Sequence, residues 1–398
     1  MNLALRELKV LNASHTVQLS CISAIDSLVT AEVPQKDNFS LGEALQSYYP
    51  LLELVFTYLD KSSLQIACRT SSIWKDLATK ELNKRIWPTW ITFARCGALT
   101  CSVGFNHNNV SFGIFAYNPS LVQLNKTLCV HSSLDETNMS VTEYLDTITE
   151  TQLQYCVIAC ASLLPIAPSS RVNRCAIDTA FQGLFIPHIP HVQTYMFEAF
   201  PKSVNRLWDE VTPKLQVKCC IIFCSQPRFV EPFLSGLLKD QKPESLALGG
   251  GIIHSKKSLK MPEGESLKES EIFCITFLQG DDTESNFKTY SVVILNETED
   301  EAGFLKELLK FKEQVVLHKY GIIFRFCCKA KTWRTEESDI IKTHFPDFIL
   351  FGMDVNGEIG WNTCETFAQV TPKLKRKKGL PQCVYGWSTV LVLITWNK

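Results

Sequence analysis

Short unbroken runs of apolar residues recur through the chain after residue 150, and they constrain its fold more than any other feature. Such runs lie within residues 155–160, 218–224 and 388–396. They are expected of β-strands that are covered on both faces, and the β-branched run at 388–396 is expected to lie at the centre of a sheet. Helical patterns at 229–239, 300–316 and 336–343 alternate with these strands. This alternation predicts an α/β or α+β domain.

Several turn signals separate the predicted strands. The Asn- and Gly-rich segment 102–120 predicts hairpins, and residues 280–285 predict a hairpin turn between strands at 272–278 and 290–295. Asn356-Gly357 predicts a tight turn. A polar start at Ser140 predicts a helix over residues 141–155.

Composition excludes several classes of protein. The formal net charge of −1 gives no electrostatic reason to expect nucleic acid or a membrane surface as a partner, and no apolar run is long enough to span a bilayer. The sixteen cysteines form no Cys-x-x-Cys pair, so we expect buried thiols rather than disulfides. The first twenty residues lack a signal-peptide pattern. We therefore expect a reduced, intracellular protein of the cytoplasm, the nucleus or both, with no cofactor.

A second constraint is a short helical stretch near the N-terminus, at residues 50–74. Its apolar residues Leu51, Leu54, Val55, Tyr58 and Leu59 follow the spacing of one helical stripe. The polar break at 60–63 suits the cap of a second helix, and a third helix follows before β structure begins at residue 90. A unit of this size buries little core of its own, so we expect it to dock against something else.

This stretch resembles an F-box. The residues that match are Pro50, Leu51, Leu54, Val55, Leu59, Leu64, Ala67, Cys68 and Trp74, while Tyr49 and Thr70-Ser71 depart from the family pattern. The resemblance implies that Pro50, Leu51, Leu54, Val55, Leu59 and Leu64 bind a Skp-family adaptor and, through it, a cullin-RING ligase. It also implies that Trp74 braces the helices internally. From the residues alone, a small helical hairpin packed on a larger core remains an alternative.

The rest of the chain resembles a FIST domain, a ligand-sensing module of signalling proteins. The resemblance is carried by Gly249-Gly250-Gly251 and by the segments 181–187, 345–352, 356–360 and 388–390. Together the two resemblances imply an α+β chain with a small helical F-box followed by a two-part mixed α/β FIST-like domain. The expected boundaries are a partly ordered leader at 1–45, the F-box at 46–95, and FIST-like halves at 96–270 and 271–398.

Residues of two FIST-like motifs are candidates for a ligand or substrate site. The candidate residues are Gly250, Asn356, Gly357 and Glu358. The three glycines suit either a phosphate cradle or, as we prefer, a turn that ends a strand, and Glu358 suits either a ligand or the amides of its own turn. Relatives carry a glycine-containing loop after the strand ending at Cys327, whereas this chain has Cys328-Lys329-Ala330-Lys331. We therefore expect a protein-binding surface in place of a small-molecule pocket.

Other motifs add little chemistry. His188 and His191 are three apart, but Pro190 prevents a helix between them, so we expect no metal site. No nucleophile motif is present, and we expect no catalytic residue. The basic run Lys373, Lys375, Arg376, Lys377 and Lys378 suits nuclear import, an acidic partner or simply a solvated loop.

These features predict a non-catalytic substrate-recognition subunit of a Skp–cullin–F-box ubiquitin ligase. Its F-box would bind the adaptor and its FIST-like domain would bind an unknown protein substrate, with neither nucleic acid nor membrane as a partner. The alternative is a small-ligand sensor with an N-terminal docking unit of helices.

Overall fold

A computed structural model gives the fold of the chain. The residues that it describes are 49–95, 99–102, 104, 107–122, 127–131, 136–148, 153–160, 162–164, 166, 179–199, 215–238, 243–253, 272–280, 286–295, 300–364 and 381–397. The chain divides into two compact units, Met1–Tyr58 and Leu59–Lys398. The predicted leader at 1–45 lies outside the described residues.

The described part of the first unit is one helix, α4 (Tyr49–Tyr58). Leu52 and Phe56, four residues apart and so on one face, are buried. Leu54 and Tyr58 are exposed, at 49% and 52%. The helix therefore carries apolar side chains on its exposed side as well as on its buried side.

The second unit begins with a helical hairpin, α5 (Lys61–Ala67) and α6 (Ser72–Leu82). The Asp60 carboxylate accepts a hydrogen bond from the Ser63 amide at 2.7 Å and caps α5, as the polar break predicts. The Ser71 hydroxyl caps α6 through the Trp74 amide at 3.3 Å. The prediction of three short helices in this region is confirmed.

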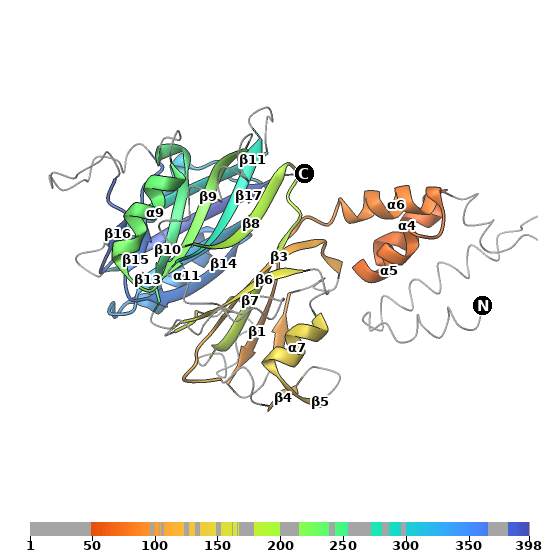
Figure 1. Cartoon of the computed structure of the whole chain (residues 1–398), viewed down its shortest axis with the longest axis horizontal. Helices are drawn as coiled ribbons and strands as arrows, with labels where there is room; N and C mark the ends of the chain where they lie inside the picture. The colour runs from red at the N-terminus through yellow and green to blue at the C-terminus, as the bar shows by residue number, and fades with distance from the viewer. Residues whose placement is uncertain are drawn as a thin grey trace, which may run out of the picture. The chain divides into compact units, whose positions relative to one another are not determined.

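Three mixed sheets and one ribbon follow (Figure 1). A five-stranded sheet has the order β2 (Leu99–Cys101), β1 (Thr89–Ala94), β7 (Thr179–Pro187), β3 (Val110–Tyr117), β6 (Gln154–Ala159). A six-stranded sheet has the order β16 (Val384–Tyr385), β15 (Glu358–Gly360), β10 (Ala247–Ile252), β9 (Leu215–Cys224), β11 (Ile272–Gly280), β8 (Val192–Ala199). A four-stranded sheet has the order β12 (Phe287–Ile294), β17 (Thr389–Trp396), β13 (Tyr320–Cys328), β14 (Ile349–Val355), and β4 (Thr127–His131) pairs with β5 (Glu136–Ser140).

The described helices of this part are α7 (Val141–Ile148), α9 (Val230–Leu237), α10 (Glu301–Gln314) and α11 (Arg334–His344), with short 3₁₀ turns at Pro227–Phe229 and Pro243–Ser245. Helix α7 begins with a capping box, in which Ser140 and Glu143 each bond the amide of the other at 3.1 and 2.6 Å. It ends at Ile148, so the helix predicted to reach residue 155 is shorter than expected, because β6 begins at Gln154.

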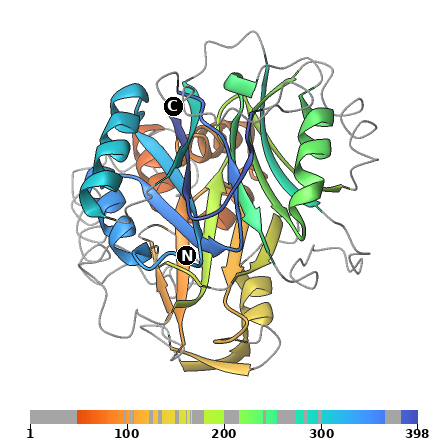
Figure 2. The ribbon, with the colours of Figure 1, turned by 90° about the vertical axis from the view of Figure 1, so that its left-hand side faces the viewer.

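Packing of the six- and four-stranded sheets explains the unbroken apolar runs. In β9, Ile221 and Phe223 face the four-stranded sheet, while Cys220 and Ile222 pack on α9. In β17 the inner residues join the same central core, and the alternate residues Leu391 and Leu393 pack under α10 and α11. Figure 2 shows α9 on one side of these sheets and the two blue helices, α10 and α11, on the other. Each strand is thus covered on both faces, and β17 lies centrally between β12 and β13, as predicted.

The prediction that Gly249, Gly250 and Gly251 form a turn is wrong. They lie inside β10, which pairs in parallel with β9 and antiparallel with β15. A Cβ added at Gly249 would lie 2.2 Å from the Val392 side chain, and one at Gly251 would lie 2.4 Å from the Val355 side chain. Gly250 has a φ of +139°, and a Cβ there would lie 1.9 Å from the Ile222 carbonyl oxygen. The glycines permit the close approach of strands and sheets.

Two other local predictions also fail. Strands β11 and β12 do not form a hairpin, because β11 pairs with β8 and β9 while β12 pairs with β17 in a different sheet. In the predicted hairpin region at 102–120, β3 pairs with β7 and β6, which are distant in sequence. Asn356-Gly357 forms a bend that carries the chain from β14 in the four-stranded sheet to β15 in the six-stranded sheet.

Candidate functional site

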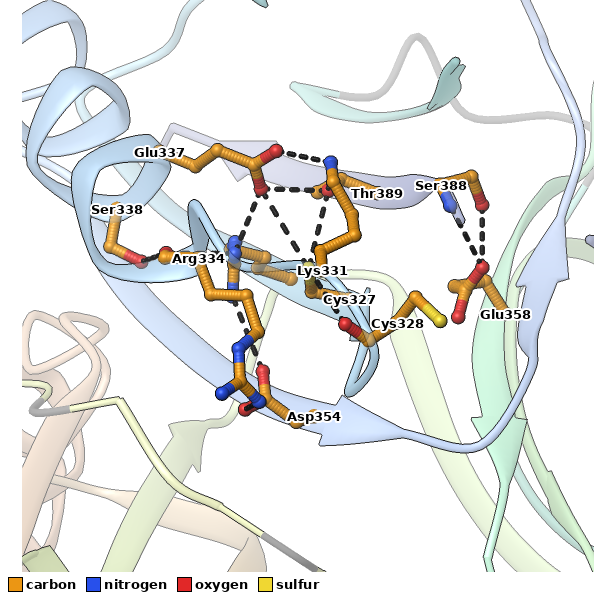
Figure 3. A network of polar contacts seen from close by, with 11 residues as sticks. Cys327, Cys328, Lys331, Arg334, Glu337, Ser338, Asp354, Glu358, Ser388 and Thr389 are labelled. Carbon is orange, nitrogen blue, oxygen red and sulfur yellow. Dashed lines mark hydrogen bonds and ion pairs between the residues drawn. The ribbon is translucent and has the colours of Figure 1, made fainter. Parts of the chain in front are cut away.

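A network of charged side chains is buried at one corner of the four-stranded sheet (Figure 3). We call it the charge network and define it as Arg325, Lys331, Arg334, Glu337 and Asp354. Arg325 lies in β13, and Lys331 lies in the segment that follows this strand. Arg334 and Glu337 lie on α11, and Asp354 lies on β14. Burying this many charges is costly unless each is paired and hydrogen-bonded.

Glu337 is the centre of the charge network. Its Oε2 accepts hydrogen bonds from Arg325 Nη2 at 2.8 Å and from Thr389 Oγ1 at 2.7 Å. Its Oε1 accepts from Lys331 Nζ, which also donates to Thr389 Oγ1 at 3.1 Å. The side chains of Arg325, Lys331 and Glu337 are fully buried. One carboxylate therefore compensates two buried cations and fastens α11 to β13 and β17.

Asp354 completes the charge network on the other side of Arg325. Its Oδ2 accepts from Arg334 Nη1 at 2.7 Å, and its Oδ1 lies 3.8 Å from Arg325 Nη1. Burial raises the pKa of Asp354, and the neighbouring charges of Arg325 and Arg334 act in the opposite direction. Arg334 is partly exposed, so the network reaches the surface there.

Cys327 is the thiol nearest to these charges, and its environment does not activate it. Thr389 Oγ1 lies 3.5 Å from its sulfur. Burial raises the pKa of the Cys327 thiol to about 11, although the positive charge of Arg325 opposes this. The thiol is therefore protonated at neutral pH and a poor nucleophile.

Glu358 lies at the start of β15 and faces the first residues of the β17 segment (Figure 3). Its Oε2 accepts from the Ser388 amide at 3.1 Å and from the Ser388 hydroxyl at 2.8 Å. Its Oε1 has no hydrogen-bond partner among the described residues, and the same holds for Asn356 Oδ1. Burial raises the pKa of Glu358, while hydrogen bonds from Ser388 and from the Cys328 thiol act in the opposite direction.

Pairing of β10 with β15 brings the predicted ligand residues together. Gly250 pairs with Ile359, and the Ile252 amide donates to the Gly357 carbonyl at 2.8 Å. The Asn356 amide donates to the Ile252 carbonyl at 2.9 Å. At Gly250 a side chain would clash with the backbone of β9. Glu358 and Asn356 are the members of the group that keep unpartnered polar atoms in the described structure.

The predicted adaptor residues fall on both units and differ in exposure. On α4, Pro50 and Leu54 are exposed and Val55 is half-buried, while the side chain of Leu51 lies outside the described structure. In the second unit Leu59 is half-buried and Leu64 is buried, so Leu64 is not accessible to a partner in this conformation. The exposed apolar side chains of the three helices are Tyr49, Leu54, Tyr58, Ile66 and Ile73.

Sequence reasoning missed the charge network and the exposed residues Ile66 and Ile73. A signal for the first was available, because Arg325 interrupts the apolar run at 321–328. For the exposed residues, the signal is position on the helix: Ile66 lies away from the face of α5 that buries Leu64 and Ala67. The basic run Lys373, Lys375, Arg376, Lys377 and Lys378 lies outside the described residues.

Comparison with known proteins gives no assignment. No model of a known protein family matches the chain, and no curated protein matches it either. Within the described ranges, no three His, Cys, Asp or Glu side chains are grouped so that they could hold a metal ion. None of the helices in that part of the chain is long and apolar enough to cross a membrane.

Proposed function

We propose that the chain is the substrate-recognition subunit of a Skp–cullin–F-box ubiquitin ligase. The observation that carries the proposal is the exposure of large apolar side chains on the short helices α4, α5 and α6. Leu54 on α4 and Ile66 on α5 are exposed at 49% and 64%. Exposed apolar residues of this kind are costly in water, and they are the residues that anchor protein interfaces.

In this proposal a Skp-family adaptor contacts Leu54 and Tyr58 on α4 of the first unit and, separately, Ile66 and Ile73 on α5 and α6 of the second unit. On α4, Pro50 lies one helical turn before Leu54 and Val55 directly follows it. Leu59 and Leu64 support the helices from within, because they are half-buried and buried. The adaptor links the chain to a cullin-RING ligase, and the FIST-like domain holds the protein substrate. Proximity is then the mechanism, and the chain contributes no catalytic group.

The charge network supports a protein-binding role for the FIST-like domain. Lys331 belongs to the segment that replaces a glycine-containing loop, and its side chain is buried against Glu337 and Thr389. The Lys329 amide donates to the Val355 carbonyl at 3.0 Å. Contacts within the chain therefore hold this segment in place, and the long side chain of Lys331 fills this corner of the four-stranded sheet.

One observation favours the alternative of a small-ligand sensor. Glu358 and Asn356 each keep a buried oxygen without a hydrogen-bond partner in the described structure, and such atoms often receive one from a ligand or water. A thermal-shift screen of amino acids and metabolites tests this function. A ligand that stabilises the wild type but not Glu358→Gln would favour the sensor over the ligase subunit.

Affinity purification from cells treated with a proteasome inhibitor tests the ligase proposal. The wild-type chain is expected to copurify with the adaptor and a cullin, together with its substrate. Leu54→Asp is expected to lose the adaptor and cullin, whereas Gln65→Asp, at an exposed polar position of α5, keeps them. Absence of the adaptor from the wild-type sample would refute the proposal.

A location in the cytoplasm, the nucleus or both belongs to the same proposal. The basic run at 373–378 is the candidate import signal. Residues 370–380 fused to a fluorescent reporter are expected to concentrate it in the nucleus. A reporter that remains cytoplasmic would remove the import role.

A further inference from the structure

Arg85 lies in the turn between α6 and β1, and its guanidinium joins three segments of the chain. Its side chain is buried, with the residue 1% exposed. Nη1 donates to the Leu59 carbonyl at 2.7 Å and to the His107 carbonyl at 3.1 Å. Nε donates to Glu81 Oε1 at 3.2 Å. We call this arrangement the Arg85 clamp and define it as Arg85, Glu81 and the carbonyl groups of Leu59 and His107.

The three segments belong to different parts of the second unit. Leu59 precedes α5, Glu81 lies near the end of α6, and His107 lies before β3. His107 Nδ1 is itself 3.2 Å from the Leu59 carbonyl oxygen. The clamp therefore connects both helices of the hairpin to the segment that leads into the five-stranded sheet.

Further hydrogen bonds join the same regions. The Asn109 amide donates to the Arg85 carbonyl at 3.3 Å, and Lys61 Nζ donates to the Val110 carbonyl at 3.4 Å. Trp396 Nε1 donates to the Ile86 carbonyl at 2.9 Å. Because Trp396 ends β17, the residue next to Arg85 is also tied to the central strand of the four-stranded sheet.

Arginine suits this position for a geometric reason. Its planar guanidinium presents several donors in fixed directions, so one side chain reaches two carbonyl groups and a carboxylate together. A lysine at the same place carries a single ammonium group on a flexible chain and cannot reproduce the fork. The neighbouring Lys84 pairs with Glu81 at 3.2 Å, but its side chain is 38% exposed.

We propose that Arg85 is a positioning residue that sets the direction in which the α5–α6 hairpin leaves the β-sheets. This rests on the proposed function, in which the hairpin belongs to the adaptor-binding helices and the sheets carry the substrate. Ubiquitin transfer then depends on where the substrate's lysines are held relative to the conjugating enzyme. A hairpin that swings freely lowers the effective concentration of those lysines.

A distance measurement on the full chain tests the clamp directly. Spin labels are introduced as non-canonical amino acids at Asp76 on α6 and Glu313 on α10, both exposed. The wild type is expected to give one narrow distribution of label-to-label distances, and Arg85→Met one at least twice as wide. Arg85→Lys is expected to lie between them and serves in place of Arg85→Met if that variant does not fold. Lys84→Met, the matched control, is expected to match the wild type. Distributions of equal width in the wild type and both Arg85 variants would overturn the proposal.

Reconstitution with the Skp-family adaptor, a cullin-RING ligase and a charged conjugating enzyme tests the consequence for ubiquitin transfer. The probe is ubiquitination of the chain itself, with the modified lysines mapped by mass spectrometry. Arg85→Met is expected to bind the adaptor within about twofold of the wild-type Kd and to show a wider set of modified lysines. An unchanged set with unchanged relative yields would contradict the positioning role. If the wild type does not bind the adaptor, the proposed function fails, and the distance distributions still decide whether Arg85 orients the hairpin.

Discussion

Replacement of Glu337 by alanine should destabilise the chain more than almost any other single change on α11. Glu337 is fully buried and accepts hydrogen bonds from Arg325, Lys331 and Thr389. Its removal leaves two buried cations with less compensation, although Arg325 keeps Asp354 at 3.8 Å and Lys331 keeps Thr389 at 3.1 Å. Breaking a buried ion pair from one side costs about 3–5 kcal/mol. This is the loss of unfolding free energy that we expect for Glu337→Ala.

Urea denaturation under reducing conditions, followed by tryptophan fluorescence, measures this loss. Glu336→Ala is the matched control on the next residue of the same helix, since Glu336 is exposed and should change the unfolding free energy by no more than about 0.5 kcal/mol. In a double-mutant cycle, Lys331→Met combined with Glu337→Ala should cost at least about 1 kcal/mol less than the sum of the single changes, because the orphaned ammonium is then absent. A Glu337→Ala loss within about 1 kcal/mol of the control, or an additive cycle, would refute the reasoning.

Three further predictions follow from the fold and the site. Gly250→Ala should cost more than about 4 kcal/mol or prevent folding, because of its positive φ and the neighbouring carbonyl, whereas Gly386→Ala, with nothing within 4 Å of the added Cβ, should not change the melting temperature. Burial raises the pKa of Glu358, so the folded state holds that proton more tightly than the unfolded state, and stability is lost as pH rises from the unfolded through the folded pKa. Glu358→Gln should therefore be more stable than the wild type at neutral pH in urea titrations, with the difference shrinking towards acidic pH; a gap independent of pH would contradict this. Asp60→Ala removes the cap of α5 and should lower the unfolding free energy by about 1 kcal/mol, measured by urea denaturation, and no change would contradict the cap.

The sequence predicts strands and helices well where burial on both faces leaves an apolar run. The run at 388–396 predicts β17 and its central place, since the consecutive apolar residues 390–394 leave no alternating polar face and are expected of a strand covered on both sides. The helix predicted at 300–316 is found as α10, and the Asp300 carboxylate caps it through the Gly303 amide at 2.5 Å. Local patterns are enough for such elements.

Strand partners could not be predicted in the same way. The alternation of apolar and polar residues and the length of an apolar run indicate that a segment forms a strand. Which strand it pairs with depends on contacts between residues far apart in the chain. For this reason the local pattern predicts a hairpin of the segments at 272–278 and 290–295, although they lie in different sheets. The glycines of β10 were misread for a related reason, since the requirement for glycine comes from Val392, Val355 and Ile222, which no local pattern reveals.

The candidate site was predicted only in part. Glu358, Asn356 and Gly357 lie next to β10 because β15 and the bend before it pair with that strand, a contact that the local motifs do not reveal. The charge network was missed because Arg325 alone marks it in the sequence, and its partners are brought to it only by the packing of α11 and β14 against β13. Exposure on the helices is also a tertiary property, and it separates Leu54 from Leu64 although both are leucines on helices.

The affinity of the purified full-length chain for a purified Skp-family adaptor tests the central claim most directly. Titration calorimetry is expected to show binding by the wild type. Leu54→Asp should raise the Kd by at least about 30-fold, which corresponds to the roughly 2 kcal/mol of a central interface residue. Gln65→Asp should leave the Kd within about twofold of the wild type. No binding by the wild type, or equal Kd values for the wild type and Leu54→Asp, would contradict the claim that these helices are the adaptor-binding surface of a ubiquitin-ligase receptor.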